Sequence, residues 1–262
     1  MLISLGKSRI SYEAGPRGVP LVLMHAFPLH QGMFDEQRAA LASVARLITF
    51  DVPGAGESEP GPVEMDDLAG IAARLLDALR IEQAVVGGVS MGGYAAFSFA
   101  RRHSDRLRGL ILANTRAVAD TEDAKKTRRE MASVAREQGA AEIANRMLPR
   151  LLGETTHSER PAVVERVRQI AESVSGETVA RLLEALANRA DSTDLLPKIS
   201  VPTLVIAGGQ DPIAPPTEAG EWARRIPSAR FVSIAGAGHL PNLETPEAFN
   251  MAVREFLATL PK

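Results

Sequence analysis

The chain has 262 residues, of which 45% are apolar, 24% charged and 4% aromatic, values that are typical of a globular protein and exclude collagen, a disordered tail and a disulfide scaffold. The formal net charge of -2 supplies no positive field for neutralising phosphates, which argues against a nucleic-acid partner. Because the chain has no cysteine, it can have no disulfide, no thiolate nucleophile and no cysteine-ligated metal.

The beginning of the chain lacks the basic start and the long apolar stretch of a secretory signal. We therefore expect a cytoplasmic protein with no membrane partner. Residues 83–100 form an uncharged stretch of nearly membrane-spanning length, but Gly87, Gly88, Gly92 and Gly93 interrupt its centre. This stretch predicts a strand, a tight turn and a helix.

Short β-branched or aliphatic runs recur along the chain and predict strands. The first two, at residues 2–5 and 9–13, are expected to form an antiparallel edge hairpin around Gly6-Lys7. Several later runs are apolar on both faces, as parallel strands covered by helices are. These later strands are predicted at residues 20–25, 47–50, 84–88, 107–113, 202–207 and 230–234.

Between the strands, apolar residues recur at three-and-four spacing, which predicts helices. The expected helices span residues 31–42, 65–79, 91–102, 217–225 and 246–260. This alternation of strand and helix predicts an α/β fold with a doubly wound, mostly parallel sheet of eight strands.

From about residue 117 to residue 195 the strand signals stop and the sequence is rich in arginine, glutamate and alanine. We expect a helical cap at 117–195, inserted after the sixth strand, with breaks near Gly139, 153–161 and Gly176. The core domain would then comprise residues 1–116 and 196–262.

Gly88-Val89-Ser90-Met91-Gly92 joins a predicted strand to a predicted helix, which is the context that a nucleophile elbow requires. The serine must occupy a cramped turn, and Gly88 and Gly92 remove the β-carbons that would collide there. An N-capping serine in a glycine turn is the alternative. The placement favours Ser90 as the nucleophile.

A serine hydroxyl at neutral pH needs a base, and the base needs a carboxylate to orient it. His239 follows the predicted strand 230–234, and Asp211 follows the predicted strand 202–207. A solvated loop histidine and a turn aspartate are the alternatives. The chain order of Ser90, Asp211 and His239, each after a parallel strand, favours a catalytic triad. The end of the sixth strand holds Asn114, which cannot supply the charge.

With these residues, the chain resembles the α/β-hydrolase family over essentially its whole length. Residues 24–28, Met-His-Ala-Phe-Pro, resemble the family's His-Gly-x-Pro oxyanion segment, and residues 51–58 resemble its Asp-x-x-Gly-x-Gly-x-Ser loop. The resemblance implies that the backbone N–H groups of Phe27 and Met91 hold the oxyanion. Ala26 stands where the family normally has glycine. Asp51 and Ser58 are expected to stabilise their loop.

Residues 113–117, 120–121 and 190–196 are similar to the bacterial branch of 3-oxoadipate enol-lactonase-like esterases, which commonly has Asp where this chain has Asn114. The resemblance implies a small ester or lactone as substrate. For His25, a supporting role at the site and a place in the core are both open. The residues predicted to bind substrate are His25, Leu240, Met131 and Met147.

The serine, aspartate and histidine indicate a serine hydrolase that cleaves a small carboxylic ester or lactone through an acyl-enzyme on Ser90, with no metal and no cofactor. Two alternatives keep the triad but change the reaction: a carbon-carbon bond hydrolase and a cofactor-free perhydrolase. A third is a ligand-sensing homologue with slow turnover. The expected partner is a small molecule, and the expected assembly is a monomer or a homodimer.

Overall fold

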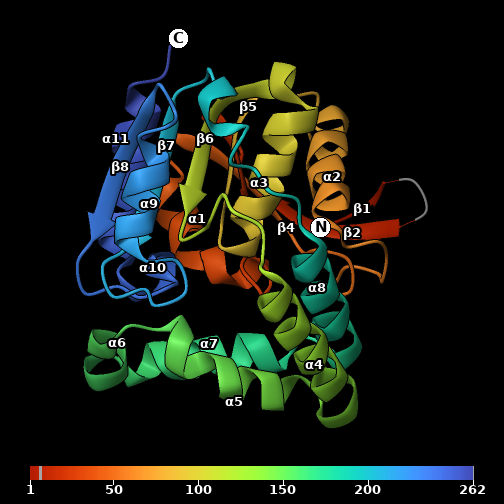
Figure 1. The fold of residues 1–262 in the computed structure, drawn as a ribbon. Coiled ribbons are helices and arrows are strands. Elements are labelled where there is room, and N and C mark those ends of the chain that lie inside the picture. The colour runs from red at the N-terminus through yellow and green to blue at the C-terminus, as the bar shows by residue number, and fades with distance from the viewer. Residues whose placement is uncertain (6–7, 262) are drawn as a thin grey trace.

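One eight-stranded sheet runs through the protein in the order β1-β2-β4-β3-β5-β6-β7-β8 (Figure 1). The computed structural model describes residues 1–5 and 8–261, so the predicted turn at Gly6-Lys7 lies outside the described residues. β3 to β8 are parallel, and β2 is antiparallel to both of its neighbours. The strands are β1 (Leu2–Leu5), β2 (Ser8–Ala14), β3 (Val19–Met24), β4 (Ala45–Phe50), β5 (Ala84–Val89), β6 (Leu107–Ala113), β7 (Thr203–Gly208) and β8 (Ala229–Ile234).

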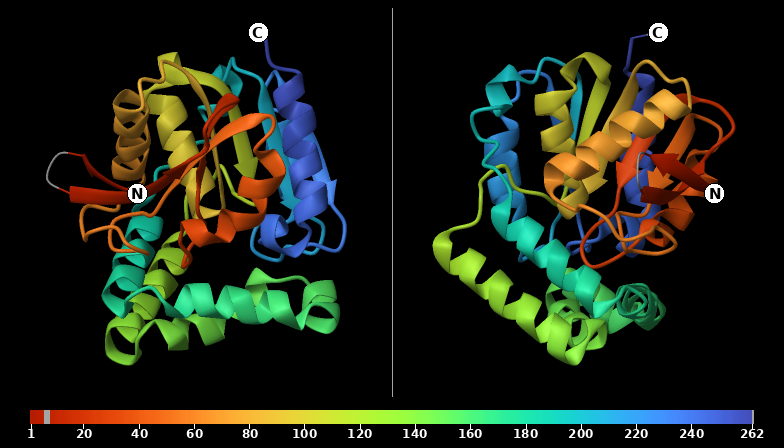
Figure 2. Two further views of the ribbon diagram at one scale, coloured as in Figure 1. Left: turned by 180° about the vertical axis from the view of Figure 1, so that it is seen from behind. Right: turned by 90° about the vertical axis from the view of Figure 1, so that its right-hand side faces the viewer.

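Helices cover both faces of this sheet (Figure 2), which confirms the predicted doubly wound α/β fold. Val22 and Met24 of β3 belong to one hydrophobic core and Leu21 and Leu23 to the other, because successive side chains of a strand point to opposite faces. One core includes residues of α2 (Met65–Ala78), α3 (Met91–Arg102) and α9 (Pro216–Ala223), and the other includes residues of α1 (Asp35–Leu41) and α11 (Pro246–Ala258).

The start of the predicted helix 31–42 differs from a regular α-helix. It is a short 3-10 helix, η1 (Gln31–Phe34), and α1 follows it. The side chain of His30 caps η1 by accepting the Gly32 N–H at 3.0 Å. There are two further short 3-10 helices: η2 (Ser104–Arg106) precedes β6, and η3 (Leu196–Lys198) precedes β7.

Between β6 and β7 the chain forms a layer of helices at the carboxyl ends of the parallel strands (Figures 1 and 2). We call this segment the insertion. Its helices are α4 (Glu122–Gln138), α5 (Ala140–Leu151), α6 (Glu154–Glu159), α7 (Pro161–Glu172) and α8 (Gly176–Asn188).

The predicted break at 153–161 is wrong in part, because α6 forms within it. Thr156 of α6 is fully buried, and its hydroxyl and the N–H of Gly153 both donate to one carboxylate of the core, that of Glu244. These hydrogen bonds to the core stabilise the helical turns of α6, whereas the glycine and proline content of the segment predicted a break. The breaks at Gly139 and Gly176 occur as expected, and Gly139 has a φ of 85°.

The uncharged stretch 83–100 forms β5, a tight turn and α3, as predicted. In the part of the chain that the structure describes, no helix has both the length and the apolar character needed to span a membrane.

Candidate active site

Ser90 occupies the sharp turn between β5 and α3 with a φ of 53° and a ψ of -111°, a conformation that is costly for a residue with a side chain. The flanking glycines make room for it. A β-carbon on Gly88 would lie 2.2 Å from the carbonyl carbon of Gly92, and one on Gly92 would lie 2.0 Å from the carbonyl oxygen of Met24. The structure thus shows the steric reason for both glycines that the sequence suggested.

The structure brings Ser90, His239 and Asp211 together, although they are far apart in the sequence. His239 Nε2 lies 2.7 Å from Ser90 Oγ, and His239 Nδ1 lies 2.7 Å from Asp211 Oδ2. His239 and Asp211 are buried, and Ser90 is partly exposed. The arrangement allows the imidazole to take a proton from the hydroxyl while the carboxylate holds the ring.

The Asp211 carboxylate is held by four donors. Oδ1 accepts the N–H groups of Ile213 and Ala214 at 2.8 and 3.1 Å, while Oδ2 accepts from His239 and from the Asn114 amide, the latter at 2.7 Å. Burial alone would raise the pKa of Asp211, but the charge and hydrogen bond of His239 and the other hydrogen bonds outweigh it and hold this pKa below its usual value. Asp211 is therefore ionised at neutral pH.

Sequence reasoning missed the contribution of Asn114, which it considered only as a replacement for the acid. Asn114 has a φ of 47° at the end of β6, and its Nδ2 donates to both Asp211 Oδ2 and the carbonyl of Gly238. Its type was a usable signal, because asparagine tolerates a positive φ and its amide can donate where aspartate cannot.

The two N–H groups that the resemblance assigns to the oxyanion are available. Across residues 1–5 and 8–261, neither the Phe27 N–H nor the Met91 N–H donates to a protein acceptor. Phe27 follows β3 and Met91 begins α3 directly after Ser90. Ala26 has no positive φ, so the family's glycine is not required there.

His25 links the loops after β3 and β4. Its Nε2 accepts the N–H of Val52 at 3.0 Å, and its Nδ1 donates to the carbonyl of Ala26 at 3.1 Å. Burial, the largest cause, lowers the pKa of His25 to about 4. Both ring nitrogens are used and the side chain is fully buried, which fits a structural role for His25. Its contact with substrate stays a prediction.

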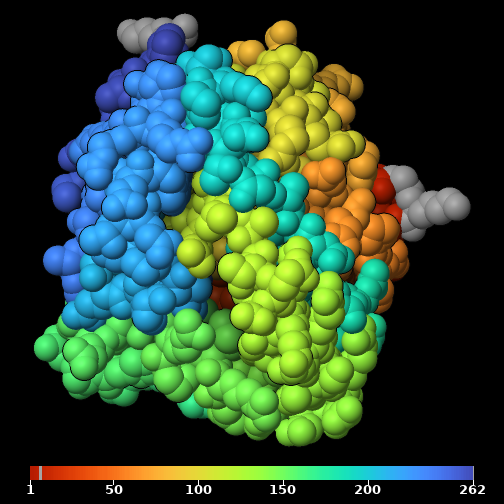
Figure 3. Space-filling view, viewed as in Figure 1, coloured from red at the N-terminus to blue at the C-terminus, as the bar shows by residue number. Residues whose placement is uncertain are grey.

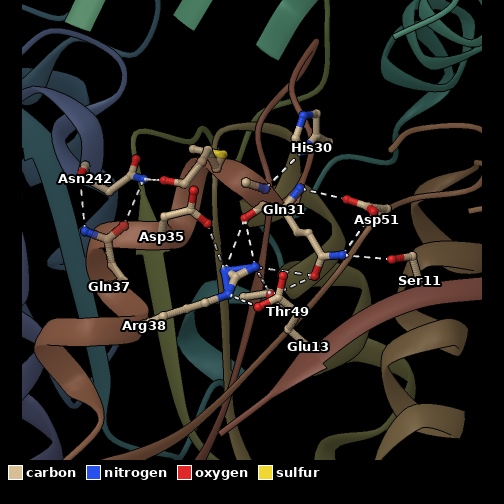
Figure 4. Close-up of polar contacts among 12 residues, drawn as sticks. Ser11, Glu13, His30, Gln31, Asp35, Gln37, Arg38, Thr49, Asp51 and Asn242 are labelled. Carbon is tan, nitrogen blue, oxygen red and sulfur yellow. Dashed lines mark hydrogen bonds and ion pairs between the residues drawn. The ribbon is translucent and has the colours of Figure 1, made fainter. Parts of the chain in front are cut away.

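A buried polar network joins the loop after β3 to the loop after β4 (Figure 4). The carboxylate of Asp51 accepts hydrogen bonds from the backbone N–H of Gln31 at 2.8 Å and from the side-chain amide of Gln31 at 3.0 Å. The same amide nitrogen, Gln31 Nε2, also donates to Ser11 Oγ. Ser58 Oγ donates to the carbonyl of Asp51 at 2.7 Å. Asp51 and Ser58 thus stabilise their loop, and the segment that follows Phe27 is anchored to the sheet.

The remaining residues predicted to bind substrate lie on three elements. Met131 is on α4 and Met147 on α5, and both are half-buried against the hydrophobic cores. Leu240 is fully buried at the start of α10 (Pro241–Glu244), a short helix that the sequence did not predict. Their contact with substrate stays a prediction.

Comparison with known proteins gives consistent relatives. A family model described as the alpha/beta hydrolase fold matches residues 19–246. The 3-oxoadipate enol-lactonase 2 of Acinetobacter baylyi is 33% identical over 235 residues, which cover 89% of this chain and 86% of that protein. A thermophilic esterase from Thermogutta terrifontis, described with malate bound, has 44% identity and a TM-score of 0.93 over 96% of this chain and 93% of its own. The enol-lactonase from Burkholderia xenovorans has 30% identity and a TM-score of 0.90 over 98% and 100%.

The chain belongs to the α/β-hydrolase fold family, as the resemblance in its sequence predicted. Its enol-lactonase and esterase relatives are carboxylic-ester hydrolases, and the chain is an enzyme of that class.

Proposed function

We propose that this protein hydrolyses a small carboxylic ester or lactone through an acyl-enzyme on Ser90. The observation that carries the proposal is the 2.7 Å contact between Ser90 Oγ and His239 Nε2, with Asp211 bonded to the other ring nitrogen. Support also comes from the strained turn at Ser90, which holds the hydroxyl at the carboxyl edge of the sheet.

In the proposed reaction, Ser90 Oγ attacks the carbonyl carbon while His239 takes the hydroxyl proton. The carbonyl oxygen becomes an oxyanion that accepts from the N–H groups of Phe27 and Met91. His239 then returns the proton to the leaving alkoxide, which in a lactone stays attached to the acyl group. A water molecule repeats the sequence on the acyl-enzyme and releases the acid, and Asp211 stabilises the imidazolium in both halves.

The proposed substrate is small because the insertion lies across the carboxyl ends of the strands. Figure 3 shows a hollow where the green insertion meets the blue, C-terminal part of the core, with red atoms of the N-terminal part at its bottom. We propose that substrate enters at this junction between the insertion and the core, and that residues 117–195 act as the cap of a core formed by 1–116 and 196–262. The cytoplasmic location and the monomer or homodimer stay predictions.

The test replaces Ser90 by alanine. We expect Ser90→Ala to lower kcat for p-nitrophenyl acetate by at least about 10³-fold, because the nucleophile is lost while the fold is kept. The matched control is Ser104→Ala, which removes an exposed hydroxyl at the start of η2 and should leave kcat unchanged. Turnover retained by Ser90→Ala would sink the proposal. A panel of short esters, enol-lactones and peroxide-dependent bromination, run on the native protein, assigns the bond that is cleaved.

A further inference from the structure

Glu244 carries a carboxylate that is 1% exposed and accepts four hydrogen bonds from neutral groups. Its Oε1 accepts the N–H groups of Gly238 and Leu240 at 2.9 and 3.0 Å. Its Oε2 accepts the Gly153 N–H and the Thr156 hydroxyl, both at 2.7 Å. Burying a carboxylate costs several kcal/mol unless donors replace its water, so a carboxylate is retained where four donors converge on one point.

The two donors to Oε1 are the residues immediately before and after His239, the proposed base. The rest of this backbone is also held: the Gly238 carbonyl accepts the Asn114 amide at 3.0 Å, and the His239 N–H donates to the carbonyl of Leu151 at 3.1 Å. Each of these bonds restrains the position from which the imidazole reaches Ser90.

The two donors to Oε2 belong to the insertion, at the start of α6. Here the backbone of the insertion lies directly against the loop of His239: a β-carbon on Gly238 would lie 2.3 Å from the nitrogen of Gly153 and 2.6 Å from the carbonyl carbon of Leu152. One carboxylate therefore binds the loop of His239 with one oxygen and the insertion with the other.

We propose that Glu244 is a positioning residue for His239. Because its carboxylate binds both the insertion and the loop of His239, His239 aligns with Ser90 only when the insertion is correctly placed against the core. This inference rests on the proposed function, in which the 2.7 Å contact between these two side chains carries the proton. Misplacing a catalytic group by about 1 Å can lower turnover about 10²-fold, so loosening the loop should slow chemistry much more than substrate binding.

The test is Glu244→Gln, which keeps the size of the side chain but replaces one acceptor oxygen by a donating NH2 group. Only one of the two donor pairs can then be satisfied fully. With p-nitrophenyl acetate we expect kcat to fall about 10- to 100-fold and KM to change less than about threefold. The matched control is Glu247→Gln, an exposed glutamate in the first turn of α11, which should leave both constants unchanged.

A second variant, Thr156→Val, removes only one donor on the insertion side and keeps the shape of the side chain. We expect kcat to fall about two- to fivefold, again without a matching rise in KM. This variant decides the question if Glu244→Gln does not fold, because unchanged kcat in Thr156→Val would then overturn the proposal. Folded Glu244→Gln protein with native kcat, or with only a raised KM, would also overturn it.

The two proposals fail separately. If Ser90→Ala is inactive while Glu244→Gln has native kcat, only the positioning role of Glu244 is refuted. If Ser90→Ala keeps its turnover, the proposed function fails, and the positioning role fails with it.

Discussion

The amide of Asn114 faces the carboxylate of Asp211; an aspartate at position 114 would place a second carboxylate there. Its Nδ2 is 2.7 Å from Asp211 Oδ2, the oxygen that also accepts from His239. A hydrogen bond to a charged group contributes about 1.5 to 3 kcal/mol, and here it holds the carboxylate in line with the imidazole. The order and spacing of Ser90, Asp211 and His239 predicted that these residues would lie together. The residue type of Asn114 was only a hint of its contact with Asp211, because that contact depends on three loops meeting in space.

For Asn114→Ala we therefore expect kcat for p-nitrophenyl acetate to fall about tenfold with little change in KM. Asn114→Asp should be slower still at neutral pH, because two carboxylates would then compete for one proton. Steady-state kinetics of the two variants provides the measurement. If Asn114→Asp is as active as the native protein, the amide does not hold Asp211 in the way described.

His25 makes the stability of the fold depend on pH. Its pKa is about 4 in the folded protein, against 6.5 for an unperturbed histidine, so the unfolded chain binds a proton first as pH falls. Stability is therefore lost between about pH 6.5 and pH 4, and from pH 7 to pH 4.5 the loss from this residue is about 2 kcal/mol. Urea unfolding at both pH values should show a smaller loss for His25→Gln than for the native protein. Equal losses would contradict a neutral, buried His25.

At the scale of elements, the sheet and its covering helices follow from periodicity, because strands buried on both faces and amphipathic helices leave clear patterns. The two short helices where the insertion meets the core do not. α6 of the insertion and α10 of the core have six and four residues, too few for a periodic signal, and the hydrogen bonds of Glu244 link them. In the structure every residue from Leu240 to Glu244 is buried, an environment for the Glu244 carboxylate that the sequence alone does not show.

The two segments that connect the insertion to the core are fastened to each other. The Ser192 N–H donates to the carbonyl of Ala117 at 2.8 Å, and Arg189 forms a 2.8 Å ion pair with Asp120. The side chains of this pair are 2% and 6% exposed, and the guanidinium carbon lies 4.3 Å from the centre of the Tyr94 ring. This buried ion pair holds the two ends of the insertion together where they connect to the core.

Asp120 also pairs with Arg128, so Arg189→Met removes one of the two cations that compensate this buried carboxylate. We expect the substitution to lower the free energy of unfolding by about 2 kcal/mol. Urea unfolding monitored by circular dichroism gives this value. The matched control is Arg136→Met, which breaks exposed pairs to Glu177 and Glu184 and should cost less than about 1 kcal/mol. Similar losses in both variants would show that burial of the Arg189 pair is unimportant.

In the molecule as a whole, the candidate site lies between the α/β core and the insertion. The strands of the core place Ser90, Asp211 and His239 at one edge of the sheet, and the insertion lies at that edge and bonds to Glu244 and to the backbone of His239. The first part could be predicted from chain order, because each residue follows a parallel strand. A helical cap was also expected, but its hydrogen bonds to Glu244 were not, because they join single backbone and side-chain groups that follow no periodic pattern.

Covalent labelling of the native protein with a fluorophosphonate, followed by mass spectrometry of its peptides, tests most directly whether Ser90 is the nucleophile. Such a reagent reacts with a serine that a neighbouring base has activated. We predict one adduct per chain, on Ser90, with loss of esterase activity in proportion to labelling. Labelling of a different residue, or an active protein with Ser90 unmodified after complete reaction, would contradict the account.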